Sequence, residues 1–342
     1  TWHDRRAEPD APAVISFSSG NTGLPKCVER THAVLVAQHA ALLAAFPLPE
    51  SDVNLPGFPL AVLHNLCRAT TTVLPSADLR SMALADVPTV LSAMRDHRVS
   101  SVSAAPAFIG RVAAHLLARG EALRQVRRIV VGGGPVSRRL ASDVLTAFPL
   151  ADIRVVYGAT EAEPIATARV REIVEADRTN LGYIAGWPVA GVEIRIDGVG
   201  DTGELLVRGP HVVRSGEEWH RTGDICRMDA RGCLWLLGRV GTEIEREGRT
   251  IYPFGVEARV ACQPGVVSSA LVAHRGAPAG ELVVQVAPSA VEQIVMDEVR
   301  ATLVEIGLRG LPARAIEVIP MDARHQSKVD RRALVRRLER RA

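Results

Sequence analysis

Residues 18–27, Ser-Ser-Gly-Asn-Thr-Gly-Leu-Pro-Lys-Cys, constrain this chain most, because they follow an apolar run and precede a helical pattern that begins near His32. The two glycines allow a tight turn with inward-pointing N–H groups, the hydroxyls add donors, and the lysine adds a compact positive charge. A strand that leads into such a loop suits a pyrophosphate or a triphosphate. The spacing is not that of the common P-loop, and an ordinary polar turn is the alternative. The candidate phosphate-binding residues are Ser18, Ser19, Gly20, Asn21, Thr22, Gly23 and Lys26.

A second ligand-binding candidate follows the apolar run 128–131, which reads as a strand. It continues into Gly132, Gly133, Gly134 and Pro135 and then into a helical pattern over 137–148. Open α/β sheets bind ligands at the carboxyl ends of their strands, where this bare backbone is expected to lie. A glycine triplet is a weak signal when it stands alone.

A third candidate follows the predicted strand 152–156 and reads Tyr157-Gly158-Ala159-Thr160-Glu161. The tyrosine offers a flat face for a purine, and the threonine hydroxyl can donate to a phosphate. The glutamate can hold Mg²⁺ through a hard carboxylate oxygen. An ordinary turn at a strand end is the alternative.

The three segments resemble, in the same order, motifs of the adenylate-forming superfamily of acyl-CoA synthetases, luciferases and peptide-synthetase adenylation domains. Residues 18–27 are similar to its pyrophosphate-binding signature, with Cys27 where a Gly usually stands. Residues 132–135 are similar to a Gly-Gly-Ala-Pro segment whose backbone packs against adenine. Residues 157–161 match its Tyr-Gly-x-Thr-Glu signature, in which the glycine lets the acyl carbonyl approach.

Three later positions carry the same resemblance. Asp224 ends a Thr-Gly-Asp match, and the resemblance implies that its carboxylate accepts hydrogen bonds from both ribose hydroxyls. Arg239 ends a Leu-Gly-Arg match and is implied to reach the nucleotide at a hinge, where Gly241 supplies flexibility. Lys328 matches the closing lysine, which enters the active site for adenylation, whereas a lysine in a basic tail is otherwise solvated.

The predicted fold is α/β: an adenylate-forming enzyme fold that lacks most of the usual N-terminal subdomain, since only 17 residues precede Ser18. We expect an ATP- and acyl-binding domain over 1–238, whose β-rich part covers about 180–238, and a mobile α+β domain over 239–342. Either the sequence is a fragment, or the enzyme is naturally shortened, or a homo-oligomer or a partner chain supplies the missing part.

The acyl pocket is expected to be shaped by residues 54–75 and 157–165. The first segment is broken by prolines and ends in a run over 70–75 that reads as a buried strand. The resemblance implies pocket roles for His64, Gly158 and Ala159, and an unassigned core or surface histidine is the alternative for His64.

Composition and charge exclude several other classes. A 47% hydrophobic and 23% charged chain is not disordered, and a net charge of +3 does not by itself indicate nucleic acid. Five scattered cysteines predict free thiols in a reducing, cytoplasmic compartment and argue against zinc. No stretch predicts a membrane span, and the basic C-terminal helix reads as a solvated face, with an acidic carrier protein as the alternative partner.

The resemblance implies an ATP- and Mg²⁺-dependent activation of a carboxylic acid as an acyl-adenylate. Segments 157–164, 220–224, 234–239, 248–253, 256–258 and 321–325 look closest to the β-lactone synthetases of long-chain olefin biosynthesis, which take a β-hydroxy acid. Ligation of the acyl group to CoA, a carrier protein or an amine is the alternative. A nucleotide-binding but catalytically incomplete regulatory or complex subunit is the alternative of a different class.

Overall fold

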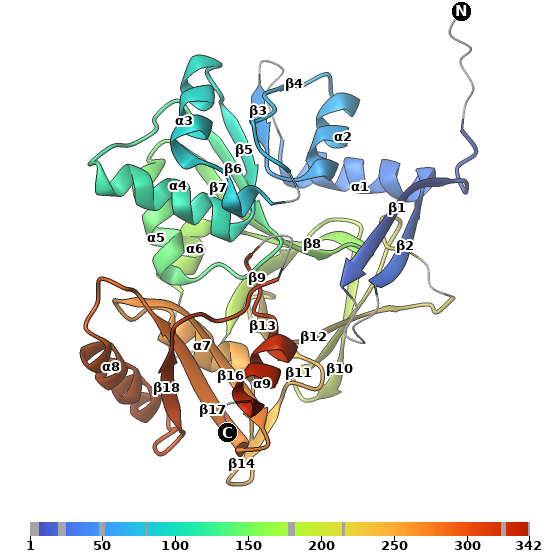
Figure 1. Ribbon diagram of the computed structural model, residues 1–342. Coiled ribbons are helices and arrows are strands. Elements are labelled where there is room, and N and C mark those ends of the chain that lie inside the picture. Colours follow the sequence, from blue (N-terminus) through green and yellow to red (C-terminus); the bar gives the residue numbers. More distant parts are fainter. Residues whose placement is uncertain are drawn as a thin grey trace, which may run out of the picture.

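The computed structural model describes residues 7–19, 25–47, 52–79, 81–176, 182–213, 216–322 and 326–340 (Figure 1). Of residues 18–26, only the backbone within the strands is described. The chain has a mixed α/β fold built around one large sheet. Among the described residues, no helix combines the length and apolarity needed to cross a membrane.

The large sheet has 11 strands in the order β10-β11-β12-β13-β9-β8-β7-β6-β5-β3-β4. Strands β4, β3, β5, β6 and β7 pair in parallel, and the remaining strands pair antiparallel. The pairing changes from parallel to antiparallel between β7 and β8, and this is where the helix-covered half of the sheet meets its β-rich half. The strands are β3 (Val53–Pro56), β4 (Thr71–Thr72), β5 (Ser101–Ala104), β6 (Arg128–Gly132), β7 (Asp152–Ala159), β8 (Ala162–Arg169), β9 (Tyr183–Pro188), β10 (Glu193–Val199), β11 (Thr202–Arg208), β12 (His220–Met228) and β13 (Leu234–Arg239).

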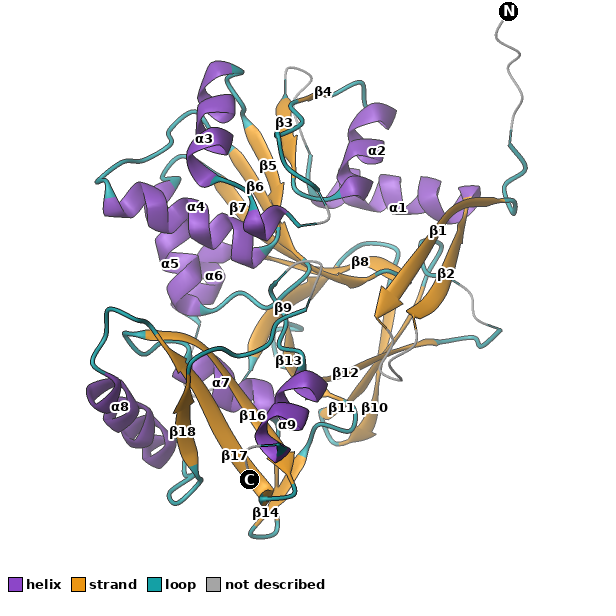
Figure 2. Ribbon diagram, viewed as in Figure 1, coloured by secondary structure: helices purple, strands orange, loops and turns teal. Residues whose placement is uncertain are grey.

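Helices cover the parallel half of the sheet, as the secondary-structure colouring makes plain (Figure 2). Prolines occupy first-turn positions in α2, α3 and α4, where the missing N–H needs no partner. Phe108 and Phe148 are completely buried between these helices and the sheet and anchor the main core. The helices of this half are α1 (His32–Ala45), α2 (Pro59–Cys67), the 3₁₀ turn η1 (Met82–Leu84), α3 (Val87–Asp96), α4 (Pro106–Ala118), α5 (Arg138–Ala147) and α6 (Val170–Glu175).

The prediction of a buried strand over 70–75 is wrong. Only Thr71–Thr72 pair with the sheet, as the edge strand β4, and Thr71 is exposed. An edge strand needs no apolar partner on its outer side, and Pro75 cannot donate to a ladder. Val73 of this segment is partly buried and packs against the main core, whereas Leu74 is exposed.

An antiparallel hairpin precedes α1 and was not expected. Strands β1 (Pro12–Ser19) and β2 (Pro25–Thr31) form a separate two-stranded sheet. The Thr31 side chain then accepts a hydrogen bond from the Val34 N–H at 3.3 Å and caps α1. The predicted phosphate loop thus connects two strands, whereas the sequence suggested a strand followed directly by a helix.

The chain beyond residue 239 forms its own sheets and its own hydrophobic clusters. Glu257, 4% exposed, lies at its centre, where Arg331 Nη2 contacts its Oε1 at 2.5 Å and the Leu271 N–H donates to the same oxygen at 2.8 Å. This α+β arrangement agrees with the expectation, while the boundary at 238/239 stays a prediction. The elements are β14 (Ile244–Arg246), β15 (Arg249–Ile251), α7 (Pro253–Val260), β16 (Val266–His274), β17 (Ala277–Val286), α8 (Glu292–Glu305), β18 (Ala313–Ile316) and α9 (Arg331–Glu339).

All five cysteines are free thiols, as expected from their scatter in the sequence.

Candidate active site

Three of the predicted nucleotide residues meet at one carboxylate. Tyr157 Oη donates to Asp224 Oδ2 at 2.7 Å, and Arg239 Nη1 donates to Asp224 Oδ1 at 2.8 Å. These side chains come from β7, β12 and β13, and Asp224 and Arg239 are direct register partners. The sheet therefore brings together residues that are far apart in the chain, from Tyr157 to Arg239.

Burial keeps the Tyr157 hydroxyl protonated. It raises the pKa of Tyr157 well above its usual value, and the neighbouring Asp224 charge adds to the effect. Tyr157 is therefore a neutral donor at any physiological pH. Its hydroxyl orients the carboxylate, and its ring remains the surface expected to face a purine.

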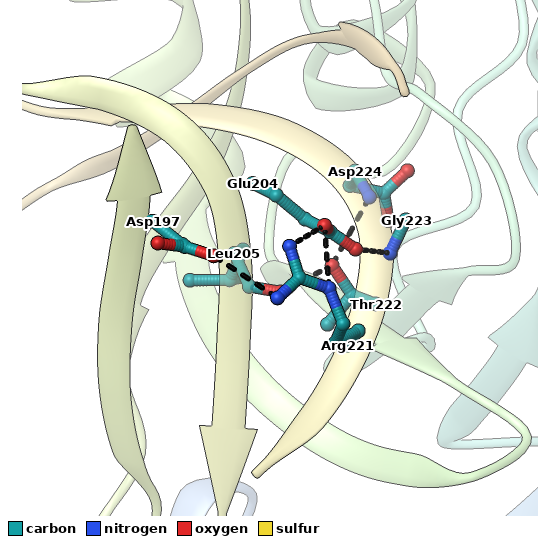
Figure 3. A network of polar contacts seen from close by, with 7 residues as sticks. All are labelled: Asp197, Glu204, Leu205, Arg221, Thr222, Gly223 and Asp224. Atoms are coloured by element: carbon teal, nitrogen blue, oxygen red, sulfur yellow. Dashed lines mark hydrogen bonds and ion pairs between the residues drawn. The ribbon is translucent and has the colours of Figure 1, made fainter. Parts of the chain in front are cut away.

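The backbone around Asp224 is held by a polar network on β11 and β12 (Figure 3). Gly223 adopts φ +71°, and its N–H donates to Glu204 Oε1 at 3.1 Å. Thr222 Oγ1 donates to the Leu205 carbonyl at 2.8 Å and accepts the Asp224 N–H at 3.1 Å. These bonds fix the direction in which the carboxylate leaves the strand.

An arginine closes the outer side of the same network (Figure 3). Arg221 donates through Nη1 to Asp197 Oδ2 at 3.0 Å and through Nε to Glu204 Oε2 at 2.8 Å. The Arg221 side chain is 54% exposed, so we assign these ion pairs a positioning role and little stability.

The segment with the predicted metal ligand forms a tight turn between β7 and β8. Ala159 pairs with Ala162, which leaves Thr160 and Glu161 at the tip. The Glu161 carbonyl accepts a hydrogen bond from the Val213 N–H at 2.7 Å, which ties the turn to the segment after β11. The signature therefore spans the end of a strand and the turn that follows it.

The predicted glycine segment lies against the segment of the closing lysine. Gly133 adopts φ +84°, and a β-carbon on Gly134 would stand 2.6 Å from Ser327 Cβ. Ser327 Oγ also accepts the Ala107 N–H at 3.1 Å, at the start of α4. Pro135 completes the glycine segment after β6. The described part of the final motif thus stands at the carboxyl end of the parallel sheet.

Lys328 has an exposed side chain and a fixed backbone. Its N–H donates to Asp322 Oδ1 at 2.8 Å, and the Ser327 N–H donates to the same atom at 2.9 Å. Gly241, the predicted hinge, adopts φ +81° and has open space where a β-carbon would stand. The Thr242 hydroxyl accepts the Arg239 N–H at 3.2 Å and holds the backbone on the other side of Gly241.

The predicted phosphate loop lies partly outside the described residues. Gly20, Asn21, Thr22 and Gly23 are not described. Ser18 and Ser19 belong to β1, where Ser18 pairs with Lys26 of β2, so the strands bring both ends of the loop together.

His64 is not a solitary side chain. Its Nδ1 lies 2.7 Å from Nδ1 of His39 on α1, and the two rings meet at 65°. Burial, together with the nearby His39 and Arg68, lowers the pKa of His64 to about 4. Sequence reasoning missed His39, although Gln38 and His39 interrupt an otherwise apolar helix and could have indicated buried polar contacts.

The donors at the β7–β8 turn fit magnesium. Thr160 and Glu161 offer hard oxygens, and the described residues contain no group of three His, Cys, Asp or Glu that would form a complete protein cage. Mg²⁺ commonly binds to one or two carboxylates and completes its shell with water and phosphate oxygens. A site completed by a nucleotide triphosphate is therefore compatible with these side chains.

Comparison with known proteins gives one family and several relatives. Residues 2–215 match the family described as AMP-binding enzyme. The 2-succinylbenzoate–CoA ligase of Arabidopsis thaliana is 30% identical over 80% of this chain and 55% of its own length. The olefin beta-lactone synthetase of Stenotrophomonas maltophilia is 28% identical over 94% of this chain and 66% of its own length. The chain thus spans 55% to 66% of the length of these two relatives.

Solved structures share the fold. The amide bond synthetase McbA from Marinactinospora thermotolerans superimposes with a TM-score of 0.79 at 24% identity, over 97% of this chain and 70% of the other. The O-succinylbenzoate coenzyme A synthetase MenE from Bacillus subtilis, in complex with AMP, gives a TM-score of 0.77 at 24% identity. The superposition covers 96% of this chain and 69% of the MenE chain.

Proposed function

The chain belongs to the family of AMP-binding enzymes, and we propose that it activates a carboxylic acid with ATP, forming an acyl-adenylate and releasing pyrophosphate. The observation that carries this proposal is the contact of Tyr157, Asp224 and Arg239. A carboxylate oriented from both sides by fixed donors can accept hydrogen bonds from a ribose diol. Its arginine partner and the tyrosine ring then stand next to the nucleotide.

In the proposed reaction, an oxygen of the acid attacks the α-phosphorus of ATP. The bond between that phosphorus and the bridging oxygen breaks, and pyrophosphate leaves. The difficulty is to bring two anions together, which positioned positive charge and donors overcome. We assign Lys328 to the acid and the α-phosphate, and Lys26 with residues 18–23 to the departing phosphates.

Mg²⁺ fits the same proposal, with Glu161 and Thr160 as its protein ligands. Bound there, it would neutralise part of the phosphate charge. Gly158 and Ala159, on the strand before this turn, remain the proposed border of the acyl pocket. The division into a domain over 1–238 and a second one over 239–342 is also proposed, and the separate sheets beyond Arg239 support it.

For the acid we propose a β-hydroxy acid whose hydroxyl displaces AMP and closes a β-lactone. The olefin beta-lactone synthetase relative, aligned over 94% of the chain, supports this reading. A CoA ligase and an amide bond synthetase stand among the other similar proteins, so transfer to CoA, a carrier thiol or an amine is the alternative.

The decisive experiment is ATP–pyrophosphate exchange across a panel of acids, with ATP binding measured by calorimetry. We expect exchange with at least one acid and AMP release without added CoA or amine. Release that depends on CoA or an amine overturns the lactone proposal and leaves activation intact. ATP binding without exchange for any acid overturns activation and favours a regulatory subunit.

A further inference from the structure

A polar cluster lies where β2, α1 and β8 meet. We call Arg30, Gln38 and Glu163 the Glu163 cluster. Arg30 is 6% exposed and Gln38 4%. Gln38 Nε2 donates to Glu163 Oε2 at 3.4 Å, and Arg30 Nη1 donates to Gln38 Oε1 at 3.5 Å. Arg30 Nη2 donates to Ser16 Oγ at 2.8 Å, which anchors the arginine to the hairpin.

The Glu163 cluster has unused hydrogen-bonding capacity. Within the described part of the chain, the Glu163 carboxylate receives a hydrogen bond only from Gln38, and that bond is long. Arg30 Nε is buried and has no partner among the described residues. Buried polar atoms are nearly always paired, and a carboxylate can accept several hydrogen bonds. The cluster is therefore suited to a ligand that brings a polar group of its own.

The cluster includes a residue of one segment proposed to shape the acyl pocket, 157–165, and is joined through α1 to the other, 54–75. A β-carbon on Gly158 would stand 3.1 Å from both Cα and Cβ of Glu163, so this side chain begins directly behind the proposed position of the acyl carbonyl. On the other side, His39 follows Gln38 in α1 and contacts His64 at 2.7 Å. Successive residues of one helix thus join both pocket segments.

Charge favours a neutral partner for Glu163. Arg30 and Glu163 both contact the side chain of Gln38, which bridges the positive group and the negative group. Because Arg30 already balances a carboxylate charge here, an ammonium group would add an unbalanced charge, whereas a hydroxyl donates without one. An apolar substituent would leave the buried polar atoms unpaired.

We propose that Glu163, held by Arg30 and Gln38, is the specificity residue of the acyl site and accepts a hydrogen bond from a hydroxyl carried close to the carboxylate of the acid. This inference rests on the proposed function and names the residue that selects a hydroxy acid. A site built to bind a hydroxyl rejects the analogue without it more strongly than an apolar pocket rejects an added group.

The test compares two acids that differ only in this hydroxyl, a 3-hydroxy fatty acid and the unsubstituted acid of the same length. For the natural chain, we expect kcat/KM in pyrophosphate exchange to favour the hydroxy acid about ten- to hundred-fold, the range for a hydrogen bond to a charged group. In Glu163→Leu the preference falls to near unity, and in Glu163→Gln, which keeps an acceptor oxygen, part of it remains. Glu172→Gln, on the exposed start of α6, is the matched control and keeps the full preference.

The outcomes separate the two proposals. No preference in the natural chain overturns the inference without the need for any variant, and so does a preference that Glu163→Leu leaves unchanged. Exchange with both acids then still supports acid activation. Absence of exchange with every acid overturns the proposed function and this inference with it. If Glu163→Leu fails to fold, Gln38→Leu, which removes the donor that holds the carboxylate, is expected to lower the preference about three-fold or more, and an unchanged preference counts against the inference.

Discussion

Ser327 lies so close to Gly134 that no side chain fits between them: a β-carbon at position 134 would stand 2.6 Å from Ser327 Cβ and 3.1 Å from the Ser327 carbonyl oxygen. The contact joins the carboxyl end of β6 to the segment that carries Lys328. It requires glycine for space rather than for backbone conformation, because only the preceding Gly133 has a positive φ.

Gly134→Ala is therefore expected to push the segment 326–328 away from the sheet. We expect pyrophosphate exchange to fall at least about ten-fold, the loss that follows a small displacement of a catalytic group, with little change in ATP affinity. Limited proteolysis should cut faster around residues 322–332. Gly110→Ala, which meets only the end of the Leu140 side chain at 3.0 Å, is the control. An exchange rate equal to that of the natural chain would contradict the role given to this contact.

Lys328→Ala is expected to abolish adenylation and to spare nucleotide binding. A positioned charge at the reacting phosphate contributes about 100-fold or more to the rate. Pyrophosphate exchange and ATP calorimetry measure the two effects separately. Arg332→Ala removes an exposed cation of the same helical end and should leave both unchanged. Equal losses in the two variants would mean that Lys328 acts only through the overall charge of the tail.

Tyr157→Phe is expected to weaken nucleotide binding by removing the donor to Asp224 Oδ2. A hydrogen bond to a charged group contributes about 1.5–3 kcal/mol, so we expect ATP affinity to fall about ten-fold or more and Arg239 to remain paired. Asp224→Asn should cost more, because both neighbours lose their charged acceptor. Retention of full affinity in Tyr157→Phe would show that the hydroxyl does not orient the carboxylate.

The pair His39 and His64 predicts an acid-sensitive stability. Burial lowers the pKa of His64 from 6.5 to about 4, so the unfolded chain binds more protons than the folded chain between these values. The stability contributed by neutral His64 is complete above pH 6.5 and is lost as pH falls towards 4. Between pH 7 and pH 5 the loss is on the order of 2 kcal/mol.

Urea unfolding at pH 7 and pH 5 tests this dependence. His64→Gln should flatten it, and His97→Gln, at the exposed end of α3, should preserve it. A slope that survives in His64→Gln would assign the acid sensitivity to other groups.

The ion pair of Glu257 and Arg331 predicts a large loss of stability in the C-terminal part of the chain. Both side chains are mostly buried, and Arg331 Nη1 also donates to the Leu271 carbonyl at 2.7 Å. Removal of one partner from a buried pair costs about 3–5 kcal/mol, because the other charge stays buried. We expect Arg331→Met to lower the free energy of unfolding by this order, as measured by urea denaturation. Arg331→Met combined with Glu257→Gln should recover part of it; no recovery would argue against a paired charge.

The sequence was informative where local chemistry decides structure. The strand over 128–131 was predicted to within one residue of β6, and the strand over 152–156 begins where predicted but runs on to Ala159, because apolar runs followed by glycine have few alternatives. The hairpin β1–β2 was missed for a physical reason. Its second strand buries Val28 and Arg30 on one face, and a buried arginine hides the alternation that usually reveals a strand.

Long-range polar contacts could not be read from the sequence at all. Gln38 and Glu163 are separated by 125 positions, and no pattern in the sequence around either residue predicts their contact. The same holds for Ser327 and Gly134, whose meeting depends on how the C-terminal elements pack on the sheet. The proposed nucleotide-binding residues could therefore be named as residue types from the sequence, whereas their mutual distances could not.

The adjacency of Gln38 and His39 has an energetic consequence for substrate choice. Neighbouring helical positions point about 100° apart, so α1 contacts the Glu163 side and the His64 side of the pocket through one rigid backbone. A shift of α1 that makes room on the Glu163 side of the proposed pocket must therefore also move the side that His64 contacts. Substitutions at positions 163 and 64 are therefore expected to be non-additive in a double-mutant cycle. The coupling would pass through α1, because Glu163 contacts Gln38 and His64 contacts His39.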